Sequence, residues 1–485
     1  MTDEKTNIDS NPGETKPGNF RIYIVCLIAA LAGLVFGIDI GVIAQAKDFI
    51  TEDLNVSDTV MGWIVGSMMG GAACGTLISG FLTRSLGRKY TLIVSGLLFV
   101  LSCLGCALAW NGIVLVIARL AVGFSIGIAS FTAPLYLSEV APKSIRGTMI
   151  STYQLMITIG ILASFTINMF IRQSTFTGAE GQNAADFLIP NVSMGWRAMF
   201  FATVVPSLLF LAGVFFLPKS PRWLISKGRK QEALEVLRRI RGSEAEAQSE
   251  SREIIETVSK NGSSGGLALF RSNPNFRKTV FLGITLQFLQ QFCGINIVMY
   301  FGPELFIASG FSSEFASGIG TVAIGLTNVL ATFIAIAFVD RLGRRRILQV
   351  GYTLMTISIL ALACFMHLGY SIAAIASVLI FIVAFAFSAG PVIWVLCAEI
   401  QPLAGRDFGI TCSTGANWLS NMAVSASFLP LMNAIGTPLT MLMFALFSAA
   451  GILIISHFTP ETKGVSLERL ESNLMNGVRL RDIGR

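Results

Sequence analysis

Charged side chains are scarce in this sequence. Asp, Glu, Lys and Arg make up 13% of the 485 residues, whereas about 25% is usual in a soluble domain, and 53% of the residues are hydrophobic. Apolar runs of about 20 residues recur along the chain, and a helix of that length crosses a lipid bilayer. These features exclude an ordinary soluble protein and predict a chain that crosses a membrane many times.

Side chains suited to metal binding or acid–base catalysis are also few. His367 and His457 stand apart from any cluster of ligands, and all eight cysteines fall in apolar segments, where they act as small buried hydrophobes. The sequence has no GxxxxGKS/T loop, which would cradle the phosphates of ATP. We therefore expect no enzymatic activity, no cofactor and no metal site.

Twelve membrane-spanning helices account for the apolar runs, so the predicted fold class is an all-α membrane protein. The predicted spans are 21–46, 58–83, 89–110, 112–138, 147–171, 196–217, 275–305, 314–338, 346–368, 370–398, 406–432 and 438–458. On the second span, a glycine row suggests close helix contacts: Gly66, Gly70, Gly71 and Gly75.

Two six-helix bundles, 21–217 and 275–458, follow from this layout. The polar insert between them, 218–274, is interpreted as a cytoplasmic helical linker, in which RKQEALEVLRRIRG (229–242) has the pattern of an amphipathic surface helix. Polar tails occupy 1–20 and 459–485, and we expect no cleavable signal peptide.

The net charge of +7 is explained by loop topology, and we expect no nucleic-acid partner. With the predicted spans, only Lys47, Arg172 and Arg197 lie on odd-numbered connections or at the span end beside one, and Arg119 lies deep within a span. The remaining Lys and Arg lie on the tails and the even-numbered connections. Because basic loops stay in the cytoplasm, both termini are predicted to be cytoplasmic.

The two halves carry the same landmarks in the same order, which indicates duplication of a six-helix unit. LGRK at 86–89 follows the second span, and LGRR at 342–345 follows the eighth. An ExxPxxxR pattern follows the fourth span at 139–146 and the tenth at 399–406. The last pair, after the sixth and twelfth spans, is PKSPR at 218–222 and PETKG at 460–464.

These landmarks place charges at the cytoplasmic ends of helices. We expect Glu139 and Glu399 to pair with arginines, to lock the halves together when the protein faces outward, and to release them when the inside opens. The expected gate residues are Arg88, Glu139, Arg146, Asp340, Arg344, Glu399 and Arg406. Alternatively the charges only anchor helix ends at lipid headgroups, which fits any one landmark but fits the repeat less well.

The stretch LQFLQQFCGINIVMYFGP at 286–303 combines an apolar background with amides and glycines. Its amides include Gln290, Gln291 and Asn296. Amides in hydrocarbon need hydrogen-bond partners, and glycines at 294 and 302 would let the helix bend or unwind. A bendable, amide-lined helix suits a site for a neutral polyhydroxylated solute. The alternative is that the amides only bond to neighbouring helices.

After its polar tail, the sequence resembles the sugar porter family of the major facilitator superfamily, most closely the bacterial galactose and arabinose proton symporters. The resemblance rests on the landmarks above, on QQFCGIN (290–296) and on RDFGITCSTGANWLSN (406–421). It implies the major facilitator fold. Two positions depart from family patterns. Arg84-Ser85 stands where the first loop usually reads Asp-Arg, and Ala386 stands where glucose facilitators carry glutamate.

Sugar recognition needs polar groups that bond hydroxyls and an aromatic face for the ring. The resemblance implies substrate contacts from Gln154, Gln290, Gln291, Asn296, Asn328, Trp394, Asn417 and Trp418. Asn421 lies one turn from Asn417 and could also face inward. Each amide taken alone could instead only form hydrogen bonds between packed helices, and Trp418 could equally fill the core.

Two ionisable residues lie inside spans, Asp39 in the first and Arg119 in the fourth. Charges within a membrane are costly, so such groups usually pair or carry protons. The resemblance implies that Asp39 and Arg119 form the proton-coupling pair. The alternative is a static buried ion pair.

The expected function is proton-coupled symport of a monosaccharide of the galactose, arabinose, glucose or xylose class, by alternating access. A sugar uniporter and a non-transporting sugar sensor are the alternatives. We expect a monomer in the bacterial inner membrane whose partners are the sugar, the proton and the lipid bilayer.

Overall fold

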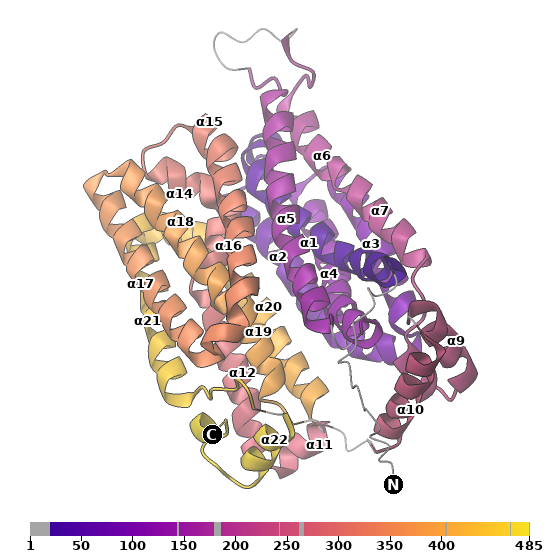
Figure 1. Cartoon of the computed structure of the whole chain (residues 1–485). Helices are drawn as coiled ribbons and strands as arrows, with labels where there is room; N and C mark the ends of the chain where they lie inside the picture. The colour runs from indigo at the N-terminus through magenta and orange to yellow at the C-terminus, as the bar shows by residue number, and fades with distance from the viewer. Residues whose placement is uncertain are drawn as a thin grey trace, which may run out of the picture.

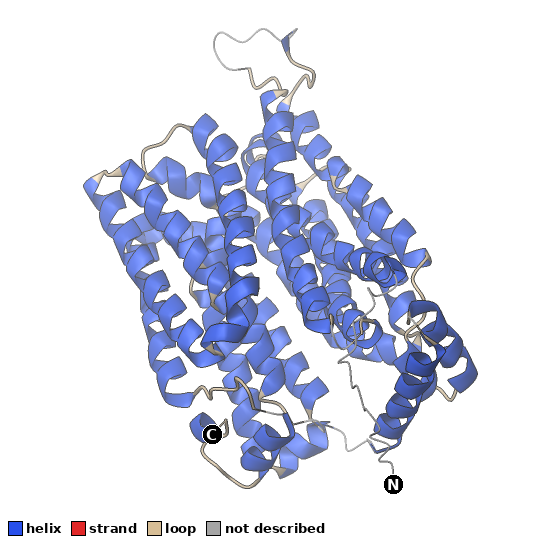
Figure 2. Ribbon diagram, in the orientation of Figure 1, coloured by secondary structure: helices blue, strands red, loops and turns tan. Residues whose placement is uncertain are grey.

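The chain folds into long helices. The computed structural model describes residues 20–142, 145–178, 186–241, 243–260, 266–402, 405–465 and 467–484. Figure 2 shows helices and loops and no strand among the described residues, and their only β-type pairing is one isolated bridge between Thr175 and Ile189. Eleven of the described helices are long and apolar enough to cross a membrane. A further helix of 30 residues, Arg406–Ile435, is as long but more polar. The protein is therefore an all-α multi-pass membrane protein.

The first half contains six crossings, the sixth made of two consecutive helices. They are α1 (Phe20–Leu54), α2 (Asp58–Ser85), α3 (Arg88–Ala107), α4 (Gly112–Val140), α5 (Arg146–Gln173), α6 (Val192–Ala202) and α7 (Val204–Phe215). Four short helices follow, namely α8 (Pro221–Ser226), α9 (Lys230–Ile240), α10 (Glu244–Lys260) and α11 (Gly266–Ser272).

The second half also has six crossings, and three of them are interrupted. The seventh crossing comprises α12 (Pro274–Phe292), α13 (Ile295–Tyr300) and α14 (Gly302–Ala308). The eighth comprises α15 (Ser313–Phe315), a π-helical turn at Ala316–Gly320 and α16 (Thr321–Leu342). The others are α17 (Arg344–Leu368), α18 (Ser371–Phe387) with α19 (Ala389–Glu399), α20 (Arg406–Ile435) and α21 (Thr437–Phe458), and α22 (Leu467–Met475) lies in the tail.

Figure 1 shows the two halves side by side, with α8–α11 and the described C-terminal residues at one end, called here the linker end. The opposite end, near α15, is called the far end. At the linker end, α8–α10 attach to the first half. The Trp223 indole donates to the Arg84 carbonyl at 3.1 Å, and Arg241 donates to the Val140 carbonyl at 2.9 Å.

The α9 helix is amphipathic, as its sequence pattern predicts. Its buried residues recur at helical spacing and face one side: Ala233, Val236, Leu237 and Ile240. The intervening charged residues face away, so the apolar stripe holds the helix against the first half.

Glycines let α2 approach two neighbours closely, which confirms the expectation from the glycine row. A Cβ atom on Gly71 would lie 2.0 Å from the Leu120 carbonyl oxygen of α4, and one on Gly123 would lie 1.7 Å from the Met68 oxygen of α2. On its other side, Gly62 of α2 faces Ala426 of α20, where a Cβ would lie 2.5 Å from a carbonyl oxygen. Backbones therefore touch directly, both inside the first half and across to the second.

Replacing Gly123 with alanine should destabilise the protein, because the new methyl group would displace the backbone of α2. Overpacking of this kind costs about 1–3 kcal/mol or more. A thermal unfolding midpoint measured in detergent should fall by several degrees. Gly80→Ala is the matched control, since no atom lies within 4 Å of its Cβ position. An unchanged midpoint for Gly123→Ala would contradict the close approach of α2 and α4.

Candidate functional site

The seventh crossing is broken where its sequence predicts a bend. The α12 helix ends at Phe292, Gly294 adopts a left-handed conformation with φ of +94°, and α13 begins at Ile295. A second break separates α13 from α14 at Phe301. Positive φ favours glycine, so Gly294 permits the turn without strain.

Buried amides join four of these helices into one network. The Gln290 amide donates to the Ala389 carbonyl at 2.6 Å. The Asn417 amide donates to the side-chain oxygens of Gln287 and Gln290, each at 2.6 Å. Gln291 donates to the Gln290 side chain at 3.4 Å, and Asn296 donates to the Gln291 oxygen. The amides thus link α12, α13, α19 and α20 inside the protein and do not face lipid.

Two of the predicted contacts keep free hydrogen-bonding groups. Gln154 of α5 is half-buried and Asn328 of α16 is buried. The part of the chain that the structure describes gives neither side chain a hydrogen-bond partner, since only the Asn328 carbonyl is engaged, by the Thr332 hydroxyl. Both amides can therefore bind a polar solute without first giving up a protein partner.

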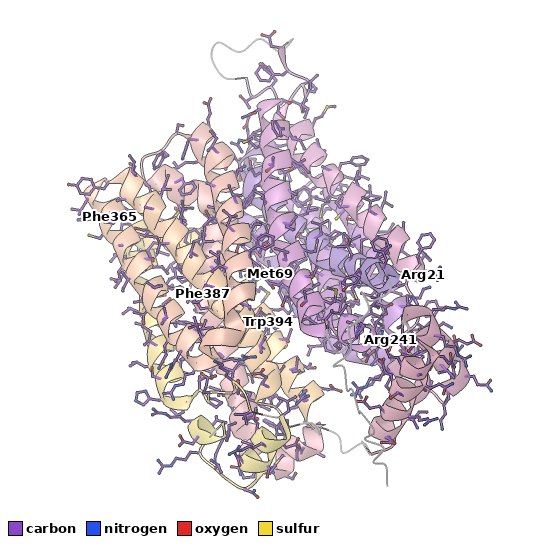
Figure 3. All side chains as sticks on the ribbon, viewed as in Figure 1. Arg21, Met69, Arg241, Phe365, Phe387 and Trp394 are labelled. Carbon is purple, nitrogen blue, oxygen red and sulfur yellow. The ribbon has the colours of Figure 1, made fainter. Side chains whose placement is uncertain are left out.

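The two tryptophans occupy different environments. Trp394 of α19 is 37% exposed, and Figure 3 shows it between the halves. Trp418 of α20 is buried, and its ring meets the ring of Phe36 of α1 edge-on, with centroids 5.5 Å apart.

One buried donor next to the network, the Trp418 indole, lacks a partner among the described residues. A buried donor left unpaired costs about 1–3 kcal/mol, which a hydroxyl-bearing solute could recover.

The predicted coupling pair is formed and fully buried in the first half. One Arg119 nitrogen donates to both Asp39 carboxylate oxygens, at 2.7 and 2.9 Å. Arg119 also donates to the Ile64 carbonyl at 3.3 Å. Asp39 lies one helical turn after Phe36, the α1 residue that touches Trp418. The ion pair therefore adjoins the helix face that contacts the amide-bearing α20.

At the linker end, the repeated landmarks converge in the same way in each half. Glu139 accepts from Arg88 at 2.7 Å and from the Ser220 hydroxyl at 2.6 Å. Glu399 accepts from Arg344 at 3.2 Å and from the Thr462 hydroxyl at 2.6 Å. Sequence reasoning missed both hydroxyl partners, although PKSPR and PETKG supply them at equivalent places in the repeat.

These two ion pairs lie within the halves and not between them. The side chains of Arg146 and Asp340, two of the predicted gate residues, fall outside the described residues. Arg406 donates to the Gln401 carbonyl of its own half at 3.4 Å.

Across the halves at this end, Arg84 and Asp407 approach to 3.4 Å with side chains 77% and 84% exposed. Exposed pairs contribute about 0–1 kcal/mol, so this contact holds the linker end weakly.

The far end is held by buried polar contacts that sequence reasoning missed. Lys47 forms an ion pair with Glu304 of α14, and its ammonium lies 4.0 Å from the centroid of the Phe301 ring. Nearby, the Gln45 amide donates to the Thr321 hydroxyl at 2.8 Å.

The predicted loop position of Lys47 is wrong. The α1 helix continues to Leu54, so Lys47 lies inside it and is only 2% exposed. A lysine near the end of an apolar run looks like a loop anchor until its buried partner on another helix is known.

A comparison with known families identifies the protein class. The model of the family described as "Sugar (and other) transporter" matches residues 25–474. The chain belongs to this sugar transporter family.

Two relatives from Escherichia coli (strain K12) are similar to the chain over almost its full length. A galactose-proton symporter is 47% identical over 489 residues, covering 100% of this chain and 99% of the relative. An arabinose-proton symporter is 44% identical over 468 residues, covering 95% of each.

Among solved structures of similar proteins, the partially occluded inward open conformation of the xylose transporter XylE from E. coli superposes with a TM-score of 0.80. It is 29% identical, and the match covers 92% of this chain and 100% of that one.

Proposed function

We propose that the protein imports a monosaccharide of the galactose, arabinose, glucose or xylose class together with a proton, across the bacterial inner membrane. The observation that carries the proposal is the buried Asp39–Arg119 pair, one helical turn from the contact between Phe36 and Trp418. An acid beside a hydrogen-bonding site suits coupled transport. The relatives described as galactose-proton and arabinose-proton symporters support the same activity.

The sugar binds between the halves in this proposal. Gln154 and Asn328 offer unengaged amides, and the network on α12, α13 and α20 offers the rest. Trp394 and Trp418 provide aromatic surface for the C–H face of the ring. Because each hydroxyl must find a partner, the placement of the amides selects the sugar.

Asp39 couples the proton to the sugar. In one state it contacts Arg119, and when the halves rearrange it loses that contact and takes a proton from water. We propose one proton per sugar. A membrane potential of about 100 mV then contributes about 2.3 kcal/mol, enough for roughly fifty-fold accumulation.

Alternating access moves the bundles 21–217 and 275–458 against one another. Both termini and the linker 218–274 lie in the cytoplasm, so the linker end faces inward. In the outward-facing state, Glu139, Glu399, Arg146 and Arg406 close this end together with Arg88, Asp340 and Arg344. The protein works as a monomer.

Uptake into membrane vesicles tests the proposal directly. A panel of sugars should include one that accumulates against its gradient, with external pH rising alongside uptake. An uncoupler should abolish the accumulation. Equilibration without accumulation, unaffected by the uncoupler, would instead identify a uniporter.

Replacing Gln290 or Asn296 with alanine should weaken sugar binding by about 1–3 kcal/mol, or roughly five- to 150-fold, because a sugar hydroxyl loses its partner. Isothermal titration in detergent measures the change. Gln349→Ala is the matched control, since its amide bonds the Ser456 hydroxyl between α17 and α21. Unchanged affinity in both site variants would place the sugar elsewhere.

A further inference from the structure

A cavity lies at the linker end of the first half, apart from the amide network. Its volume is about 490 Å³, and it opens between the starts of α1 and α3, the end of α7 and the α9 helix. One wall is apolar and includes Val25, Phe216 and Ile240. Basic side chains outnumber acidic ones around it: Arg21, Lys89, Lys219 and Arg239 face Glu232 and Glu235.

Two of the basic groups are already engaged by the protein. Lys219 pairs with Glu232 at 3.0 Å, and Lys89 donates to the Phe215 carbonyl at 2.7 Å. Arg21 and Arg239 are different, because they have no ion-pair or hydrogen-bond partner within the described ranges. The cavity therefore presents two available guanidinium groups above an apolar wall.

Exposed aromatic residues line the cavity or lie within two residues of its lining in the sequence, which indicates that it is near a membrane surface. Phe20, Tyr23, Tyr90 and Phe216 are all exposed. Such rings concentrate where the hydrocarbon meets the headgroups. Figure 3 shows Arg21 at the outer edge of the first half, away from the second half. The cavity thus opens on the side of the first half that lies away from the second half.

We propose that this cavity binds the phosphate headgroup of an anionic phospholipid from the leaflet at the linker end. Arg21 and Arg239 would hold the phosphate, because a planar guanidinium fork matches phosphate oxygens in a bidentate way. Basic pockets between membrane helices are suited to anionic headgroups. The apolar wall would contact the start of an acyl chain. Free phosphate has no acyl chain and could not make this contact. This inference does not depend on the transported solute.

Native mass spectrometry of the full chain tests the proposal, with phosphatidylglycerol and phosphatidylcholine as competing lipids. The unaltered protein should retain phosphatidylglycerol preferentially, and Arg21→Gln/Arg239→Gln should lose about tenfold or more of that retention. Arg277→Gln/Lys278→Gln is the matched control. It removes two exposed basic residues at the linker end of the second half, outside the cavity.

The outcomes distinguish a lipid bound in the cavity from free phosphate and from attraction by general charge. Loss in the cavity variant alone, with an unchanged unfolding midpoint, supports the site. Equal loss in both variants would show attraction by general charge and overturn it, as would full retention in the cavity variant. A third arm adds inorganic phosphate alone. If phosphate displaces phosphatidylglycerol at equal concentration, the ligand is free phosphate and the lipid assignment fails.

Discussion

Asp39→Asn should abolish sugar accumulation while leaving sugar exchange intact. Asparagine cannot release a proton, so the cycle loses its link to the membrane potential. The accumulation ratio should fall from as much as roughly fifty-fold to about one. Vesicles loaded with unlabelled sugar should still take up labelled sugar by exchange, because the substitution changes no residue of the amide network.

Asp48→Asn is the control for this experiment, since Asp48 lies on the same helix and pairs with Arg172 at 2.9 Å near the far end. Its accumulation should stay close to that of the unaltered protein. Persistent exchange in Asp39→Asn also shows that the variant folds with Arg119 unpaired. If Asp39→Asn vesicles still concentrate sugar, the proton is carried elsewhere.

Lys47→Met should shift the protein strongly toward a state that is open at the far end. Lys47 and Glu304 belong to different halves, and opening that end separates them. Removing one partner leaves a buried charge uncompensated, which costs about 3–5 kcal/mol in the closed arrangement. The equilibrium between the two arrangements should therefore move by roughly 100-fold or more.

The double variant Lys47→Met/Glu304→Leu distinguishes charge from packing. With both charges gone the far end can close on apolar side chains, so the equilibrium should return toward its original position. Hydrogen–deuterium exchange of α13 and α14 measures it, because their amides become exposed when the far end opens. Equal exchange in the single and the double variant would mean that the ion pair does not hold the halves together.

Much of the fold was predictable because membrane crossing imposes a simple length rule. Runs of apolar residues marked each crossing. Even the more polar α20 was predicted as a crossing, because its amides are scattered along an apolar run that is long enough to span a bilayer. The helix ends were less predictable. The α1 helix runs past 46 to Leu54 because its last polar residues find partners on other helices.

Part of the site was also predictable, since amides and charges inside apolar runs demand partners. The need of Asp39, Arg119 and Gln290 for polar partners followed from that demand, whereas Asn417 and the coupling of Asp39 with Arg119 came from the family resemblance. Their choice of partner did not follow from that demand. Nothing local in the sequence brings Lys47 to Glu304, more than 250 residues away, or turns Glu139 toward Ser220. Those contacts depend on how the bundles lie in space.

The equivalent clusters around Glu139 and Glu399 each stabilise one half of the protein and do not connect the two halves. In this structure Glu139 and Glu399 each bind an arginine of their own bundle and a hydroxyl of the segment that follows it, so neither ion pair spans the two bundles. The resistance to tilting falls on the few links that span both bundles. Natural variants should accordingly form two groups. Substitutions within one bundle should destabilise it and lower the yield of folded protein. Substitutions at the contacts between the bundles should change the rate of transport.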